Sequence, residues 1–226
     1  MMRIFRILII LCFINTGGCQ ASKLAFIVES AIKTVTEDYP EKEQLKAYEA
    51  LEQFVLQGNF NARLFLGCEY LTGVRREKNV DLGLQYLTEG VESGSTEAMF
   101  CLSRHYYREK QFYDYVKTLE QCSQMGDVFC KVELGSFLLD EKSISFAYVG
   151  GVKNLDYQDI NKAFKLLDSA SEAGSTDANF ILGEQYFYGK HVEKDYEKAK
   201  AYFEKCLEDP YFSSFDIVEE YLRKID

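Results

Sequence analysis

Residues 178–189 read ANFILGEQYFYG, and residues 192–199 read VEKDYEKA. In the first stretch, Leu182 and Tyr186 are four residues apart, which places them on the same face of a helix. In the second stretch, Asp195 precedes a run of helix-forming residues and is expected to be the N-cap of that helix. These two stretches therefore predict a pair of helices joined by a short loop.

The same pattern of small, apolar and aromatic residues occurs three more times upstream. The copies read Ala62…Leu66-Gly67…Tyr70…Gly73, Ala98…Leu102-Ser103…Tyr106 and Cys130…Leu134-Gly135…Leu138. The residues expected to follow the second helix of each pair are Gly58, Gly94, Gly126, Gly174 and Pro210, spaced 32 to 48 residues apart. A period of this size is typical of a solenoid built from helix pairs.

Glycines and short polar residues are expected to mark the helix ends. The four glycines follow helix ends, where a left-handed residue lets the backbone satisfy the last carbonyl groups. Asn79 and Asp159 each precede a second helix by a few residues and are expected N-caps. The helix boundaries can therefore be assigned from the sequence.

This repeat pattern resembles the Sel-1-like repeat, a relative of the tetratricopeptide repeat, over about residues 44–210. The resemblance implies an all-α fold, a right-handed α/α solenoid of helix-turn-helix repeats. A half-repeat that ends at Gly58 would come first and four repeats would follow. Residues 19–43 are expected to form an N-terminal helical segment, and residues 211–226 are expected to form a C-terminal capping helix.

Two repeats depart from the pattern. The second repeat is four residues short around Lys110–Phe112, so its loop is clipped. The third carries twelve extra residues near 141–158, where alternating apolar residues around Gly150 and Gly151 favour a small hairpin. Such an insertion is more often decoration than a binding site, but the sequence leaves both interpretations open.

The composition excludes several classes of protein. The 226 residues are 47% hydrophobic, 15% aromatic and 27% charged, which rules out a disordered chain and a membrane protein with many spans. The formal net charge is −10 and the pI is about 4.9, so a nucleic acid is not an expected partner. Only two prolines are present, which favours a helical fold.

The first residues resemble an export signal. Arg3 and Arg6 precede the uncharged apolar stretch 7–14, which is too short to cross a bilayer. We therefore expect residues 1–18 to be a signal peptide. Its removal would change the net charge from −10 to −12, because two arginines and no acids would be lost.

The sequence around Cys19 resembles a bacterial lipobox. Gly17 and Gly18 are the small residues expected before a lipidated cysteine, and Gln20 after it favours the outer membrane. Ordinary cleavage after Ala21 is the alternative. The chain is therefore expected to be exported, as a periplasmic or outer-membrane lipoprotein or as a secreted protein, with a lipid anchor as its only membrane contact.

The cysteines lead to one specific prediction. Cys122 and Cys130 bracket the bend between two helices, which can bring two Cα atoms within the roughly 5–6 Å of a disulfide. Similar pairs occur in the cysteine-rich Helicobacter branch of the resembling family. Cys206 occupies a position equivalent to Cys122 but lacks a partner cysteine, so it should be unpaired. Cys68 and Cys101 could pair, although two small buried thiols are the expected state.

No arrangement of residues typical of catalysis or metal binding is found. His105 and His191 lie in different repeats without nearby ligands, so we expect no metal site, and no motif indicates a cofactor. Ser30 and Lys33 match the Ser-x-x-Lys pattern of β-lactam-binding enzymes, an activity described for some cysteine-rich relatives. The two motifs that accompany this pattern are missing, so the chain is not expected to be an enzyme.

The expected functional surface is the concave face of the solenoid, which the first helices line in tetratricopeptide arrays. The side chains expected there are Cys68, Leu71 and Thr72 in the first repeat, Arg104, Tyr107 and Arg108 in the second, and Glu184, Phe187 and Tyr188 in the last. Arginine and aromatic residues are typical of protein-binding hot spots. The alternative is that Tyr107 and Phe187 pack against neighbouring helices.

These features favour a non-enzymatic protein-binding module of the bacterial cell envelope, with a basic protein as a suitable partner for the negative chain. A periplasmic immunity protein that neutralises a secreted effector is an alternative, because some such proteins resemble secreted Sel-1-like arrays. β-Lactam binding or hydrolysis is a second alternative.

Overall fold

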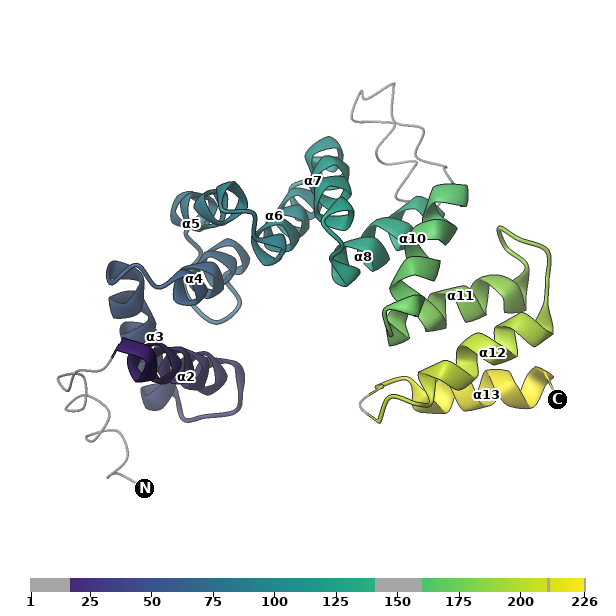
Figure 1. Cartoon of the computed structure of the whole chain (residues 1–226), viewed down its shortest axis with the longest axis horizontal. Coiled ribbons are helices and arrows are strands. Elements are labelled where there is room, and N and C mark those ends of the chain that lie inside the picture. Colours follow the sequence, from purple (N-terminus) through teal and green to yellow (C-terminus); the bar gives the residue numbers. More distant parts are fainter. Residues whose placement is uncertain (1–16, 141–159, 211, 226) are drawn as a thin grey trace. The chain divides into compact units, whose positions relative to one another are not determined.

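The structure is a computed structural model that describes residues 17–140, 160–210 and 212–225 (Figure 1). All the elements in these ranges are α-helices, as the sequence predicts. The chain divides into two compact units, of which the first ends at Tyr86 and the second begins at Leu87. No helix in the described ranges is long and apolar enough to cross a lipid bilayer.

The first unit contains α2 (Gly17–Thr36), α3 (Glu41–Leu56), α4 (Phe60–Thr72) and the start of α5 (Val80–Glu92). Both α2 and α4 pack against α3. The buried side chains of this unit include Val28, Val35, Leu51, Leu66 and Tyr70. The expected N-terminal segment 19–43 therefore corresponds to most of α2 and the first residues of α3.

The second unit contains three helix pairs and a last helix. The pairs are α6 (Thr96–Arg108) with α7 (Phe112–Gln124), α8 (Val128–Leu139) with α10 (Ile160–Glu172), and α11 (Thr176–Tyr188) with α12 (Tyr196–Cys206), followed by α13 (Phe215–Ile225). The pairs stack because α7 packs on α8 and α10 packs on α11, as expected for an α/α solenoid.

The first helices of these pairs lie in a row. In Figure 1, α8 lies between α6 and α11, and it contacts both of them. The last helix, α13, packs against α12 and covers the end of the unit. Helices α6, α8 and α11 therefore form one continuous row within the second unit.

The bends between pairs are built from a glycine and a capping residue. Gly58, Gly94, Gly126 and Gly174 have φ values of +80°, +81°, +96° and +88°, which confirms the predicted left-handed positions. The next residue in each case, namely Asn59, Ser95, Asp127 or Ser175, accepts a hydrogen bond from the backbone N–H three residues later. Each first helix of these repeats therefore begins at a fixed residue.

The predicted caps of the second helices are confirmed where the structure describes them. Asn79 accepts a hydrogen bond from the Leu82 backbone at 3.1 Å, and Asp195 accepts one from the Lys198 backbone at 3.0 Å. The third predicted cap, Asp159, lies outside the described residues. The insertion near 141–158 and its predicted hairpin also lie outside them.

The shortened second repeat has a distinct loop. In the first and last repeats, Gly73 and Gly189 end the first helix with φ values of +63° and +66°. In the second repeat, Lys110 is the left-handed residue, with a φ of +59°, and α7 begins two residues later. A lysine in this conformation is less favourable than a glycine because its Cβ crowds the backbone.

Candidate partner-binding surface

The predicted surface residues of α6 lie at an exposed aromatic edge. Arg104 and Arg108 are exposed, and 45% of Tyr107 is accessible to solvent. The Tyr107 ring also contacts the rings of Tyr115 and Phe137, with centroids 5.1 and 6.5 Å away. Tyr107 is therefore held in place by packing while one part of it faces solvent.

The packing around Tyr107 includes a buried polar contact. The Tyr115 hydroxyl donates a hydrogen bond to Glu133 of α8 at 3.2 Å. Burial, together with the nearby Glu133 carboxylate, raises the pKa of Tyr115 well above its usual value. Because the Tyr115 hydroxyl stays neutral, it links α7 to α8 without placing a second negative charge beside the Glu133 carboxylate.

The predicted surface residues of α11 are partly covered by α13. The Tyr221 hydroxyl donates a hydrogen bond to Glu184 at 2.8 Å and lies 3.0 Å from the hydroxyl of Tyr188. The Phe187 ring packs against the Tyr221 ring, with centroids 4.9 Å apart. Phe187 therefore packs against a neighbouring helix, whereas Tyr188 remains 56% exposed.

Leu71 is buried, so the prediction that it contacts a partner on the concave face was wrong. Only 3% of Leu71 is exposed, and its side chain packs so close to Gly83 that a Cβ added there would be 2.8 Å away. Helical spacing placed Leu71 on the expected concave face, but α5 packs directly over that position in the first unit. Leu71 stabilises the α4–α5 pair.

One exposed residue of α8 was not predicted from the sequence. Phe129 is 68% exposed, although it is a large apolar side chain. It is the second residue of α8, as Glu97 is of α6 and Asp177 is of α11. All three side chains are exposed. The exposure of Phe129 could therefore have been predicted from the sequence, because the equivalent residues of the neighbouring repeats, Glu97 and Asp177, are charged.

Phe129 continues the surface of α6. Its ring contacts the ring of Phe100 with centroids 6.1 Å apart, and the Arg104 guanidinium lies 5.8 Å from the Phe100 ring centroid. An arginine over an aromatic face is an electrostatically favourable contact. Arg104, Phe100 and Phe129 therefore form one connected group that extends across α6 and α8.

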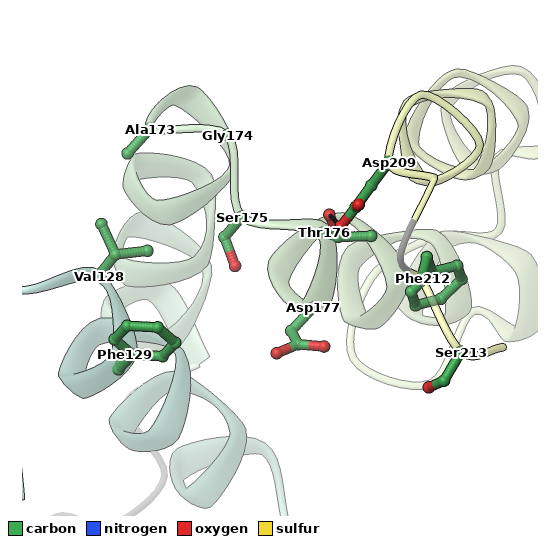
Figure 2. Close-up of a pocket in the computed structure, with 10 residues that line it drawn as sticks. All are labelled: Val128, Phe129, Ala173, Gly174, Ser175, Thr176, Asp177, Asp209, Phe212 and Ser213. Carbon is green, nitrogen blue, oxygen red and sulfur yellow. Dashed lines mark hydrogen bonds between the residues drawn. The ribbon is translucent and has the colours of Figure 1, made fainter. Parts of the chain in front are cut away.

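A hollow of about 470 Å³ lies beside Phe129, and we name it the Phe129 hollow (Figure 2). It is lined by Val128 and Phe129 at the start of α8, Ala173, Gly174, Ser175, Thr176 and Asp177 at the α10–α11 bend, and Asp209, Phe212 and Ser213 between α12 and α13. The hollow is thus built where the ends of several helices meet.

Hydrogen bonds fix the wall of the Phe129 hollow that α11 provides. The Ser175 hydroxyl accepts a hydrogen bond from the Ala178 backbone at 3.2 Å and caps α11. The Thr176 hydroxyl donates one to the Asp209 carboxylate at 2.9 Å, which links α11 to the end of α12. These two hydrogen bonds hold the wall in place.

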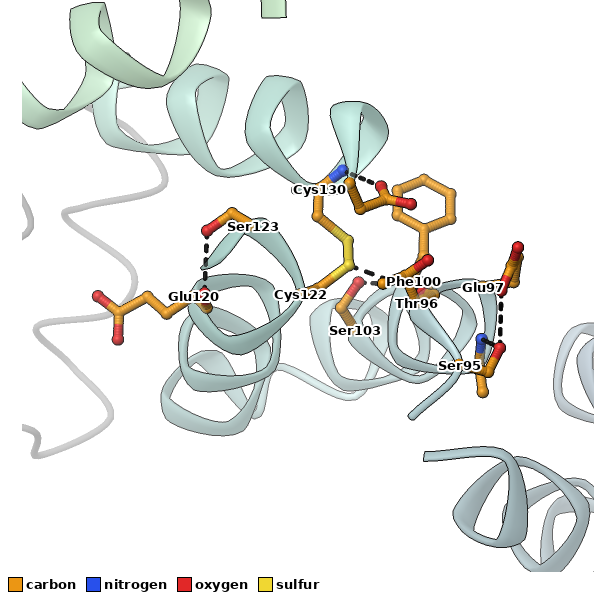
Figure 3. Close-up of a disulfide and its surroundings, with 11 residues drawn as sticks. Ser95, Thr96, Glu97, Phe100, Ser103, Glu120, Cys122, Ser123 and Cys130 are labelled. Carbon is orange, nitrogen blue, oxygen red and sulfur yellow. Dashed lines mark hydrogen bonds between the residues drawn. A yellow bond between two sulfur atoms is a disulfide. The ribbon is translucent and has the colours of Figure 1, made fainter. Parts of the chain in front are cut away.

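The predicted disulfide forms between α7 and α8, and Cys130 directly follows Phe129 in the chain. Cys122 and Cys130 are bonded, with Cα atoms 5.8 Å apart, and Figure 3 shows the bridge beside Thr96 and Phe100 of α6. The Asp127 carboxylate accepts a hydrogen bond from the Cys130 backbone at 2.9 Å. The bridge and the cap together fix the first turn of α8, which carries Phe129.

The remaining described cysteines give one confirmed prediction and one correction. Cys206 is a free, buried thiol as predicted, and burial raises its pKa to about 12. Cys68 and Cys101 are each in a disulfide and are not free thiols, so the prediction of two buried thiols was wrong. Both side chains are only partly buried, and this exposure leaves them open to oxidation. The side chain of Cys19 lies outside the described part of the chain.

The possible metal and catalytic groups lack a suitable arrangement. Cys122, Asp127 and Cys130 place their ligand atoms within 4.8 Å of one another, but the two sulfurs are already bonded to each other. Ser30 is exposed on α2, and Lys33 forms an ion pair with Glu37 at 3.6 Å instead of contacting the serine in a pocket. The Ser-x-x-Lys match therefore has no active-site geometry around it in the described residues.

A second, smaller hollow of about 330 Å³ lies in the first unit, beside Tyr70 and Arg76. The Arg76 guanidinium lies 4.2 Å from the Tyr70 ring centroid and donates a hydrogen bond to Glu52 at 2.7 Å. Nearby, Arg75 donates one to Glu69 at 2.7 Å. These contacts hold the loop between α4 and α5 and give the two arginines a structural role.

Comparison with known proteins agrees with this architecture. The family model of the Sel1 repeat matches residues 61–95, 148–175 and 176–205. These matches cover the first and last repeats and the second part of the third. The second repeat, whose loop is shortened, lies outside them.

Two solved structures are similar to the chain. A protective antigen present in uropathogenic Escherichia coli strains, which displays an SLR fold, has 25% sequence identity and a TM-score of 0.64, and the match covers 90% of this chain and 43% of that one. A Sel1 repeat protein from Oxalobacter formigenes has 16% identity and a TM-score of 0.62, with 82% of this chain and 73% of that one covered. The comparison with curated proteins gives no match.

The chain spans less than half of the Escherichia coli protein that it resembles. Sel1-repeat proteins are generally protein-interaction modules and typically act as non-enzymatic scaffolds. The repeated helix pairs, their glycine bends and the family match agree on one assignment: residues 61–95, 148–175 and 176–205 match Sel1 repeats.

Proposed function

We propose that this chain is a protein-binding module of the bacterial cell envelope, and that it holds its partner on the row of α6, α8 and α11. The observation that carries the proposal is the exposure of Phe129 beside the Phe129 hollow. Burying a phenylalanine side chain of this kind gains about 1.5–3 kcal/mol. An aromatic anchor next to a hollow is the usual centre of a protein-protein interface.

The residues around Phe129 suit the edge of such an interface. Arg104 and Arg108 are exposed on α6, and Tyr107 offers a fixed aromatic edge close to them. Because Tyr107 is already held by Tyr115 and Phe137, it would lose little conformational freedom on binding. The predicted residues of α6 therefore remain candidates for partner contacts.

The test uses two variants that each remove an aromatic ring, one in the row of first helices and one outside it. Wild type, Phe129→Ala and Tyr113→Ala would serve as baits for envelope proteins of the source cell, with a captured partner then titrated against each. Tyr113 is a matched control because it is 48% exposed but lies on α7, outside the row of first helices. We expect Phe129→Ala to weaken binding about tenfold or more and Tyr113→Ala to leave it unchanged.

Equal affinity of all three proteins for the partner would contradict the proposed site. A partner that is itself an enzyme, and that loses its activity in the complex, would identify the chain as an immunity protein. A structural envelope protein would identify it as a scaffold.

The envelope part of the proposal rests on the lipobox-like sequence at Cys19 and on the apolar stretch before it. The likeness to a protective antigen supports export, since antibodies reach proteins outside the cytoplasm. Radiolabelled palmitate should enter the wild-type protein and not Cys19→Ser. Absence of label from both would refute lipidation at this residue.

A further inference from the structure

Among the described residues, those that line the Phe129 hollow carry only negative formal charge. Asp177 and Asp209 contribute carboxylates, and the other lining residues are apolar, glycine or hydroxyl-bearing. No lysine, arginine or histidine lines the hollow within residues 17–140, 160–210 and 212–225. With a net charge of −10 for the whole chain, this wall would attract a cation rather than an anion.

The two carboxylates have different surroundings. Asp209 is oriented by the hydroxyl of Thr176, which donates a hydrogen bond to it at 2.9 Å. Asp177 is exposed, and its carboxylate has no hydrogen-bond or ion-pair partner within the described ranges. Figure 2 shows the Asp177 carboxylate between Phe129 and Phe212. The Phe129 hollow is therefore lined by two carboxylates: that of Asp209, which Thr176 orients, and that of Asp177, which is available to a ligand.

Aromatic rings border this acidic space on two sides. Phe129, 68% exposed, presents its ring from α8. Phe212 is partly buried and held in place by the Phe180 ring, with centroids 5.8 Å apart. Carboxylates between aromatic rings are suited to a flat cation, which can stack on a ring and form hydrogen bonds with an acid at its edge.

We propose that the Phe129 hollow receives an arginine side chain of the partner protein. The guanidinium would lie against Phe129 and donate hydrogen bonds to Asp177, with Asp209 adding negative charge from the far wall. Arginine fits better than lysine because its planar head group stacks on rings and binds carboxylates through two parallel hydrogen bonds. A hollow of about 470 Å³ can admit one long side chain.

This inference rests on the proposed function for the source of the arginine, but the site itself can be tested without the partner. The probe is Nα-acetyl-arginine amide, titrated into the whole protein while backbone amide chemical shifts are followed by NMR. The citrulline analogue is the matched ligand control, because it has almost the same shape and no charge.

We expect the arginine probe to shift the amides of Phe129, Thr176 and Asp177 in a saturable manner, and citrulline to bind about tenfold more weakly or worse. Asp177→Asn and Phe129→Ala should each weaken binding of the arginine probe severalfold. Asp114→Asn is the matched control, since Asp114 is also a first-turn acid but belongs to α7. It should leave probe binding unchanged.

Three results would overturn the inference: no saturable shift in the hollow, equal binding of citrulline, or unchanged binding to Asp177→Asn. If Phe129→Ala lowers partner affinity while the arginine probe does not bind, the docking face stands and the arginine pocket fails. If the probe binds but Phe129→Ala leaves partner affinity unchanged, the arginine pocket stands and the proposed docking face fails.

Discussion

At the scale of single residues, the close packing of each helix pair depends on one small residue in its first helix. Gly135 and Gly183 follow the leucine of the repeat pattern, and Ser103 occupies the same position in the second repeat. A Cβ at Gly183 would lie 2.5 Å from the Phe203 ring, whereas Ser103 is buried without such a clash. The second helix of a pair therefore comes closest to the first helix in the repeats where this position is a glycine.

We predict that Gly183→Ala lowers the free energy of unfolding by about 1–3 kcal/mol, because Phe203 is enclosed and has little room to move. Ser103→Ala is the control, since the second repeat already accommodates a Cβ there, and it should cost about 1 kcal/mol or less. Guanidinium unfolding followed by circular dichroism measures both changes. An equal loss in the two variants would show that the close approach at Gly183 is not the cause.

The residue scale also shows why part of the surface could not be predicted. Spacing along one helix identifies which residues share a face, but it does not reveal what another element places over that face. Leu71 is covered by α5, and Phe187 and Glu184 contact α13 through Tyr221. Tyr107 and Tyr188 remain exposed because no described helix covers them completely.

At the scale of elements, the bends are the best-determined feature of the sequence. The left-handed conformation at each bend favours glycine, so the bends can be recognised in the sequence. The spacing of Cys122 and Cys130 around one bend predicts their disulfide, which the structure contains. The capping role of Asn59, Ser95, Asp127 and Ser175 was missed. It could have been predicted, because each directly follows a bend glycine and precedes a helix.

We predict that the double variant Cys122→Ala/Cys130→Ala loses about 2–3 kcal/mol of unfolding free energy, because the bridge closes a short loop in the unfolded chain. Cys206→Ala is the control for loss of a buried sulfur without loss of a bridge, since Cys206 is a free thiol in the equivalent repeat position. It should lose about 1 kcal/mol or less. Chemical denaturation compares them, and similar losses would mean that the bridge adds no stability of its own.

At the scale of the whole molecule, buried tyrosines link stability to pH. Tyr48 in the first unit and Tyr115 and Tyr221 in the second are at most 9% exposed, and burial is the main cause that raises the pKa of each. In the unfolded chain these phenols ionise near their usual pKa of about 10. In the folded protein they keep their protons to higher pH.

The contribution of these three tyrosines to stability should therefore be constant up to about pH 9 and should fall as the pH rises through about 10, since the unfolded state then binds fewer protons than the folded state. Each of these tyrosines can contribute up to about 1.4 kcal/mol per pH unit above that point. Denaturant unfolding at about pH 8 and about pH 10.5 measures the change. Equal stability at both values would show that these side chains ionise normally in the folded protein.

The helical repeats within each unit were predictable from the sequence, and the candidate binding surface was predictable only in part. Repeats of a small residue, a leucine and a glycine bend are local features, so one sequence is enough to identify them. The Phe129 hollow depends on α8, the α10–α11 bend and the loop before α13 meeting in space. No local spacing relates Phe129 to Asp177 or to Phe212, and only the three-dimensional structure brings them together.

The measurement that tests the central claim most directly is amide hydrogen exchange of the protein alone and in complex with its captured partner. We expect slower exchange on binding in the first turns of α8 and α11, at residues 128–131 and 175–178, with no change in α7 or α10. Protection confined to α7 or α10, with none around Phe129 and Asp177, would contradict it.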